Sequence, residues 1–159
     1  MREIFISFIR HGVRKFLIVD FGFSTFFPLV TVSTSLNNEF GAKVAITRSA
    51  GLGDDVRKSM LKQKRGGHAC EHESSHMIYI REDLVHMENA VEEYREQLPG
   101  TIKNGVERIY FSNRMETEHG VNGNAKLATK EKGEAILNAM VDDLLVFLEA
   151  FQKFEITTY

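Results

Sequence analysis

The chain has 159 residues, which fits one compact domain over residues 1–159, because a single core of this size buries around two-thirds of the unfolded surface. Its 20 basic and 22 acidic side chains leave a net charge of -2, so the composition gives no reason to expect nucleic acid or an anionic membrane as a partner. Cys70 is the only cysteine, which excludes an internal disulfide and predicts a reducing, cytoplasmic location.

The amino-terminal stretch, residues 1–32, is rich in apolar side chains. Arg10, Arg14 and Asp20 interrupt it before any apolar run is long enough to cross a membrane. We therefore expect this stretch to form core rather than a membrane anchor.

The first elements alternate between strand and helix patterns. Residues 16–19 predict a buried strand, residues 26–40 a helix that stops at Gly41, and residues 42–46 a second strand. Strand, crossover helix and strand form the unit of a parallel sheet. The sequence thus predicts an α/β fold with a mostly parallel sheet flanked by helices.

The later elements are mostly helical. Residues 71–80 and 88–97 predict helices, the second ended by Pro99 and Gly100, and residues 106–111 predict a late strand. A long amphipathic helix is expected from Thr129 onwards because its apolar residues recur at helical spacing.

Residues 67–76 carry the densest set of chemically active side chains, with three of the six histidines and two carboxylates. On a helix that starts early enough, His68, His72 and His76 would share one face because they are spaced by four. Such groups suit proton transfer or metal binding. The alternative is a solvated polar face at a helix start, where carboxylates also interact favourably with the helix dipole.

The stretch from His72 to His76 matches H-E-x-x-H, in which two histidines one turn apart bind zinc and the glutamate acts as a base. A zinc metallopeptidase would need a third ligand, and position alone nominates Glu92, Glu93 or Glu96. We expect this match to be incidental.

Several motifs together resemble one enzyme family. Residues 67–75 read G-H-A-C-E-H-E-S-S and residues 81–87 read R-E-D-L-V-H-M. Residues 120–124 read G-V-N-G-N, residues 128–134 read A-T-K-E-K-G-E, and residues 11–15 read H-G-V-R-K. In order and spacing these segments are similar to motifs of the creatininase (creatinine amidohydrolase) family, such as G-H-A-G-E-x-E-T-S. The resemblance extends from about residue 8 to residue 151.

The resemblance implies an α/β sandwich that hydrolyses carbon-nitrogen bonds of small-molecule amide substrates at a divalent metal centre holding Zn, Mn or Fe. His68 lies at the motif histidine, which by resemblance moves a proton at the substrate, while Glu71 and Glu73 lie at the two acidic positions. These three residues are the predicted catalytic set. The resemblance also implies that the chain assembles into a ring-shaped homo-oligomer.

The metal-binding motifs depart from the family pattern. The family's strand ends in N-G-H-G-G-N, whose histidine is a metal ligand, whereas residues 20–25 read D-F-G-F-S-T and place Gly22 at that position. The family's amino-terminal E-x-H and Asp ligands have no counterpart, so no metal ligand is assigned. The expectations are a truncated or decayed member, a site completed by another polypeptide, or a substitute site formed by His68, His72 and His76 with Glu71 or Glu73.

The predicted function is therefore a metal-dependent amidohydrolase of this family that is impaired or inactive. The first alternative, from another functional class, is a non-catalytic remnant of the fold that works by binding or assembly. The second is the H-E-x-x-H zinc metallopeptidase.

Overall fold

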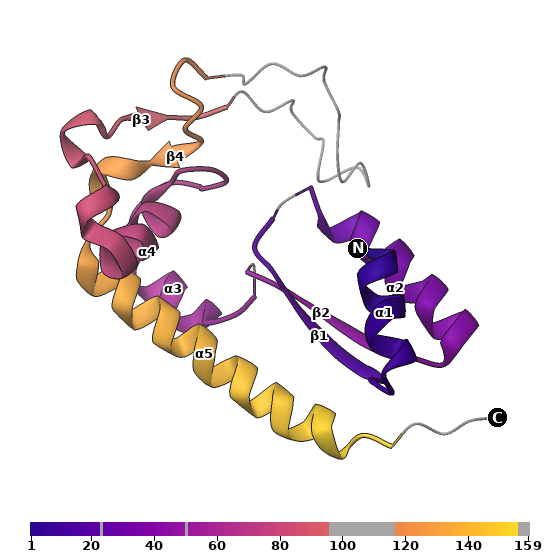
Figure 1. Ribbon diagram of the computed structural model, residues 1–159. Coiled ribbons are helices and arrows are strands. Elements are labelled where there is room, and N and C mark those ends of the chain that lie inside the picture. Colours follow the sequence, from indigo (N-terminus) through magenta and orange to yellow (C-terminus); the bar gives the residue numbers. More distant parts are fainter. Residues whose placement is uncertain (23, 50, 96–116, 156–159) are drawn as a thin grey trace, which may run out of the picture. The chain divides into compact units, whose positions relative to one another are not determined.

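The computed structural model describes residues 1–22, 24–49, 51–95 and 117–155 (Figure 1). The chain divides into two compact units, one formed by Met1–Asp54 with Ala139–Tyr159 and the other by Asp55–Asn138. The single domain expected from the length stays a prediction.

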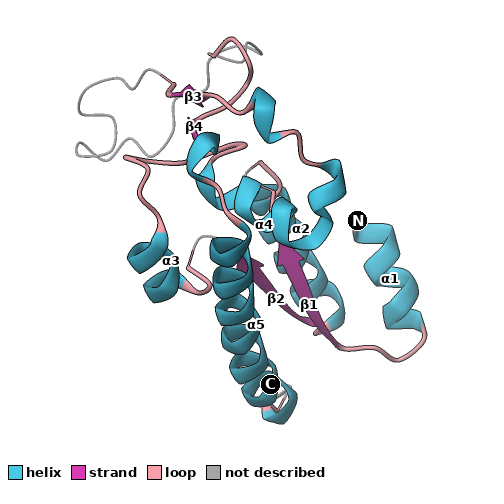
Figure 2. Ribbon diagram, turned by 90° about the vertical axis from the view of Figure 1, so that its left-hand side faces the viewer, coloured by secondary structure: helices cyan, strands magenta, loops and turns pink. Residues whose placement is uncertain are grey.

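The first unit contains the predicted parallel strands. β1 (Lys15–Asp20) pairs in parallel with β2 (Lys43–Arg48), with Phe16 opposite Val44 and Ile18 opposite Ile46 (Figure 2). The crossover between them is α2 (Phe26–Phe40), whose bounds agree with the sequence prediction. This arrangement confirms the expected α/β class.

The core of the first unit lies between the sheet and two helices, α1 (Arg2–Arg10) and α2, which Figure 1 shows on the same side of the strands. The buried residues of α1 follow helical spacing, and the Phe5 ring meets the Phe16 ring edge-on at 5.0 Å. Each such buried apolar side chain contributes roughly 1.5–3 kcal/mol. The core consists of Phe5, Ile6, Ile9, Leu36 and Ala42.

Polar contacts fix the ends of the helices in this unit. Gly41 ends α2 in the left-handed conformation, with φ of 64°, and its N–H donates to Asn37 O at 2.9 Å. At the carboxyl end of α5 (Lys130–Lys153), the Lys15 ammonium donates to the carbonyls of Phe151 and Gln152 at 3.2 and 2.7 Å. A cation at this end of a helix satisfies carbonyls that have no partner within the helix.

The second unit is mainly helical. Its elements are α3 (Asp54–Met60), α4 (Glu71–Arg81), the 3-10 turns η1 (Glu82–Leu84), η2 (Met87–Asn89) and η3 (Ala125–Leu127), the antiparallel strands β3 (Glu92–Glu93) and β4 (Gly123–Asn124), and the start of α5. The sequence predicted α4 and α5 to within a few residues.

The helix expected over residues 88–97 is wrong where the structure describes it. The chain forms η2 and then β3, and Ala125 N–H donates to Val91 O at 3.1 Å beside the β3–β4 pair. Glutamate-rich sequence favours a helix only weakly, and pairing with a distant strand overrides that preference. Pro99, Gly100 and the predicted strand 106–111 lie outside the described residues.

None of the helices in the described part of the chain is both long and apolar enough to cross a membrane. The amino-terminal stretch forms α1, β1 and part of α2, as expected for core segments rather than for an anchor.

Candidate functional site

His68 lies on a loop that leads into α4 and is fixed by a bridge to a distant segment. Its N–H donates to Asn122 O at 3.3 Å, and Asn122 N–H donates to His68 O at 2.8 Å. Gly67 packs so closely that a Cβ there would lie 2.5 Å from Asn122 Nδ2. The His68 side chain remains 61% exposed, so the loop holds the backbone rigidly and presents the imidazole to solvent.

Glu73 connects the start of α4 to this loop. Its Oε2 accepts a hydrogen bond from Ala69 N–H at 2.6 Å and lies 3.8 Å from His68 Nδ1. A carboxylate in the first turn of a helix also satisfies an otherwise unpaired N–H near its amino terminus. Glu73 therefore stabilises the loop and stands beside the His68 imidazole.

Glu71 is fully buried, and both of its carboxylate oxygens are engaged. Oε2 accepts from the backbone N–H groups of Lys62 and Gln63 at 2.9 and 2.7 Å, and Oε1 accepts from the Lys132 ammonium at 2.5 Å. Lys132 also donates to Leu127 O at 2.7 Å. These contacts join α5 to the loop before α4 and leave Glu71 poorly placed to reach a substrate.

Gln63, which the sequence analysis did not single out, organises the same region. Its side-chain Oε1 accepts from the N–H groups of Glu71 and Asn124, both at 3.1 Å. Gly123, with φ of 148°, leaves room for Gln63, since a Cβ there would lie 2.6 Å from Gln63 Oε1. Gln63 lies in a polar loop whose sequence matches no motif, so its role is seen only in the structure.

His72 and His76 pack against each other, whereas His68 precedes the helix that carries them. Their rings meet edge-on with centroids 4.2 Å apart. The pKa of each imidazole is lowered to about 4, in both cases chiefly by burial and in His72 also by the nearby His76 and Arg57 charges. Both Nε2 atoms are buried without a hydrogen-bond partner. These histidines are held as neutral groups.

The H-E-x-x-H pair has no third ligand in the described part of the chain. Among these residues, the group of three potential ligands brings Glu93 together with Glu118 and His119 and includes neither His72 nor His76. Glu92 belongs to no such group, and Glu96 lies outside the described residues. The arrangement therefore gives no geometric support to a zinc peptidase site.

The turn after β1 tests whether the family's metal centre fits this chain. Asp20 Oδ1 accepts from Gly22 N–H at 3.0 Å and from the Thr25 hydroxyl at 2.5 Å, while the buried Oδ2 has no partner. A Cβ at Gly22 would lie 2.2 Å from Thr25 Oγ1, so a histidine there would disrupt the turn. A single free carboxylate oxygen is too small a donor set for a catalytic metal. The described residues do not fit that centre.

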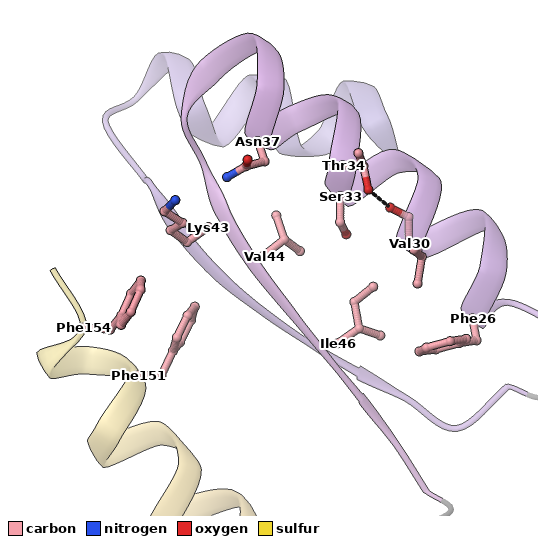
Figure 3. A pocket seen from close by; sticks show the side chains of 10 residues that line it. All are labelled: Phe26, Val30, Ser33, Thr34, Asn37, Lys43, Val44, Ile46, Phe151 and Phe154. Carbon is pink, nitrogen blue, oxygen red and sulfur yellow. Dashed lines mark hydrogen bonds between the residues drawn. The ribbon is translucent and has the colours of Figure 1, made fainter. Parts of the chain in front are cut away.

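The first unit also contains an open cavity of about 500 Å³, bounded by β2, α2 and the carboxyl end of α5 (Figure 3). None of the predicted catalytic residues His68, Glu71 and Glu73 lines this cavity. Its walls are formed by Phe26, Val30, Ser33, Thr34, Asn37, Lys43, Val44, Ile46, Phe151 and Phe154.

The parallel β-α-β unit defines an α/β protein. The loop before α4 adds an exposed histidine beside a glutamate. The family model for creatininase, described as creatinine amidohydrolase, matches residues 1–148. The chain belongs to the creatininase family. Comparison with curated protein sequences found no match.

Solved structures agree in fold. The chain is similar to a protein described as a creatinine amidohydrolase from Bacteroides fragilis, with 23% identity, a TM-score of 0.75, and coverage of 98% of this chain and 61% of that one. It is similar to a creatininase with 22% identity, a TM-score of 0.80, and coverage of 96% and 62%. A mutant creatininase complexed with creatine gives 22% identity, a TM-score of 0.73, and coverage of 94% and 62%. The chain thus spans about three-fifths of these relatives.

Proposed function

We propose that the chain is a creatininase-type amidohydrolase polypeptide that supplies the proton-transfer group of the site but not a complete set of metal ligands. The observation that carries this proposal is the His68 loop, in which a rigid backbone presents an exposed imidazole beside the Glu73 carboxylate. Similar structures include zinc and manganese forms of creatininase. In such enzymes the metal would polarise the carbonyl and activate water.

The chain's own residues support two roles. His68 can accept a proton from the attacking group or donate one to the leaving nitrogen, because its imidazole is accessible. Glu73 lies beside this imidazole, with its Oε2 3.8 Å from His68 Nδ1, and its bond to Ala69 holds the loop in place. The substrate class is a small amide or cyclic amide, in line with the creatine bound by one similar creatininase.

The test is hydrolysis of creatinine and simple formamides by untagged protein, with Zn²⁺ or Mn²⁺ added. We expect no turnover above that of His68→Ala, because the turn around Gly22 and Asp20 lacks the donors that a catalytic metal needs. Metal-dependent turnover that disappears in His68→Ala and persists in His86→Ala would show that the site is complete.

The non-catalytic alternative is favoured by one observation, which is that both oxygens of Glu71 serve internal contacts. Ligand binding separates the two possibilities when turnover is absent. A retained substrate site predicts that creatinine shifts the His68 ring resonances in a proton-detected NMR titration. If those resonances stay fixed, a role in binding other molecules or in assembly becomes the better interpretation.

A further inference from the structure

Three potential metal ligands meet in the second unit, outside the signature segment of residues 67–75. Glu93 comes from β3, and Glu118 and His119 come from the turn that precedes β4. Their ligand atoms all lie within 4.8 Å of one another. None of the three belongs to residues 67–75, which carry the family signature.

The backbone explains why these side chains converge. Glu93 lies opposite Gly123 in the antiparallel β3–β4 pair, which brings the chain just before β4 alongside β3. Gly120, with φ of 76°, closes a turn in which its N–H donates to Thr117 O at 3.3 Å. This turn places Glu118 and His119 over the Glu93 carboxylate.

The contacts between Glu93 and His119 are short and involve two points of attachment. His119 Nδ1 lies 2.7 Å from Glu93 Oε1, and His119 N–H donates to Glu93 Oε2 at 3.1 Å. The Glu93 side chain is only 18% exposed, so its position is well defined before any ion arrives. A ligand set held in place in this way loses little entropy when it binds a metal.

We propose that Glu93, Glu118 and His119 form a binding site for a divalent transition-metal ion. Two carboxylates and one imidazole give a mixed oxygen and nitrogen donor set, which suits Zn²⁺ or Mn²⁺. Ca²⁺ and Mg²⁺ prefer oxygen ligands alone and should bind more weakly. Waters would complete the coordination, because Glu118 and His119 are exposed.

In the absence of metal, the His119 imidazole and the Glu93 carboxylate are in direct contact. The Glu93 carboxylate raises the pKa of His119, and His119 lowers the pKa of Glu93.

The surface pair of His86 and Glu88 provides a matched control. His86 Nδ1 lies 3.2 Å from Glu88 Oε1, and both side chains are well exposed. This pair belongs to no described group of three potential ligands. It therefore reproduces the histidine-glutamate contact without the third donor.

The test is titration of chelator-treated, untagged protein with ZnCl₂ and with MnCl₂ by isothermal calorimetry. We expect one site per chain, weakened at least about tenfold by His119→Ala and by Glu93→Gln and unchanged by His86→Ala. Circular dichroism spectra that match the wild type would confirm that each variant is folded.

His72→Ala distinguishes this site from the H-E-x-x-H pair. If His72→Ala removes the ion and His119→Ala retains it, the proposal is wrong. It is also wrong if the wild-type chain binds neither ion, or if His86→Ala weakens binding as much as His119→Ala does. Because the readout is binding rather than turnover, the result does not depend on the proposed hydrolase function.

Discussion

The buried carboxylate of Glu71 accepts hydrogen bonds from three donors. Only one of them, the ammonium of Lys132, carries a charge. Their side chains are 0% and 13% exposed, so the pair is largely removed from water. Removing one partner of a buried ion pair leaves an uncompensated charge, which is far more costly than losing an exposed pair. The residue with the clearest structural role is therefore one that the family signature had placed in the catalytic set.

We expect Lys132→Met to lower the free energy of unfolding by about 3–5 kcal/mol, and Glu71→Gln to lower it by a similar amount. The double variant should lose less than the sum of the two, because the remaining charge is also removed. Urea denaturation followed by circular dichroism measures this. Lys130→Met is the control, because its pair with Glu82 is 52% and 66% exposed and should contribute only about 0–1 kcal/mol. Equal losses for Lys132→Met and Lys130→Met would contradict the interpretation.

His72 and His76 should make the protein sensitive to mild acid. Each folded pKa is about 4 against an ordinary value of 6.5, so between these pH values the unfolded chain binds more protons than the folded chain. Their contribution to stability is complete above pH 6.5 and is lost as the pH falls towards 4. At pH 5 the loss should be on the order of 2 kcal/mol for the pair, after allowance for partial solvent screening.

The measurement is the urea midpoint at pH 7 and at pH 5. His76→Leu should reduce the difference between the two midpoints, whereas His86→Gln, which changes an exposed histidine, should leave it unchanged. A His76→Leu protein with the wild-type pH dependence would show that burial of this pair is not the cause.

At the scale of elements, α4 and the first turns of α5 approach each other at Gly133. A Cβ at this position would lie 2.0 Å from Ser75 O and 2.9 Å from Tyr79 Cβ. The Ser75 hydroxyl, fully buried, donates to Glu71 O at 2.6 Å and accepts from Thr129 N–H at 3.1 Å. The two helices can therefore separate only by breaking this hydrogen bond at the start of α5.

We expect Gly133→Ala to destabilise the protein by about 1–3 kcal/mol, because backbone atoms must move to admit the methyl group. This exceeds the gain of up to about 1 kcal/mol that alanine normally gives over glycine inside a helix. Thermal denaturation checks the sign. Asn138→Ala, at an exposed position of the same helix, should be neutral or slightly stabilising. A Gly133→Ala protein that melts at a higher temperature would show that α4 and α5 are not in close contact.

Local pattern was sufficient to predict β1, α2, β2, α4 and α5, because in each case apolar spacing and the terminating residue agree. Helix α1 was not predicted, although its buried Phe5, Ile6 and Ile9 have helical spacing. In contrast, β3 depends on pairing with residues some 30 positions away, which local pattern does not report. The helix expected there was wrong for that reason.

The site was predictable to the extent that it is local in sequence. The signature placed His68 and Glu73 beside one another, and the structure brings them to 3.8 Å. The Glu71–Lys132 pair joins residues 61 positions apart, and no pattern in either segment indicates that they meet. The convergence of Glu93 with His119 likewise depends on the β3–β4 pair.

At the scale of the whole molecule, the described chain exposes many large apolar side chains. On α5, Val141, Leu145 and Val146 are exposed by 49, 53 and 72%. Val141 and Leu145 are four residues apart and so share a face of the helix. Exposed apolar side chains that share a helix face are often covered by association with another chain.

We expect the purified protein to self-associate through this part of α5, in line with the predicted homo-oligomer. Burial of the exposed valine and leucine side chains would remove apolar surface from water, which stabilises the associated form by about 25 cal/mol per Å².

Sedimentation velocity over a concentration series should show species heavier than the 18.1 kDa chain. The double variant Leu145→Lys, Val146→Lys should shift them towards the monomer, because each buried lysine would have to be desolvated without a partner. Glu88→Lys, an exposed charge reversal in η2 and outside α5, should keep the wild-type distribution. A wild-type chain that sediments as a monomer at every concentration would contradict the expectation, and a double variant that associates as the wild type does would exclude this face of α5 as the contact.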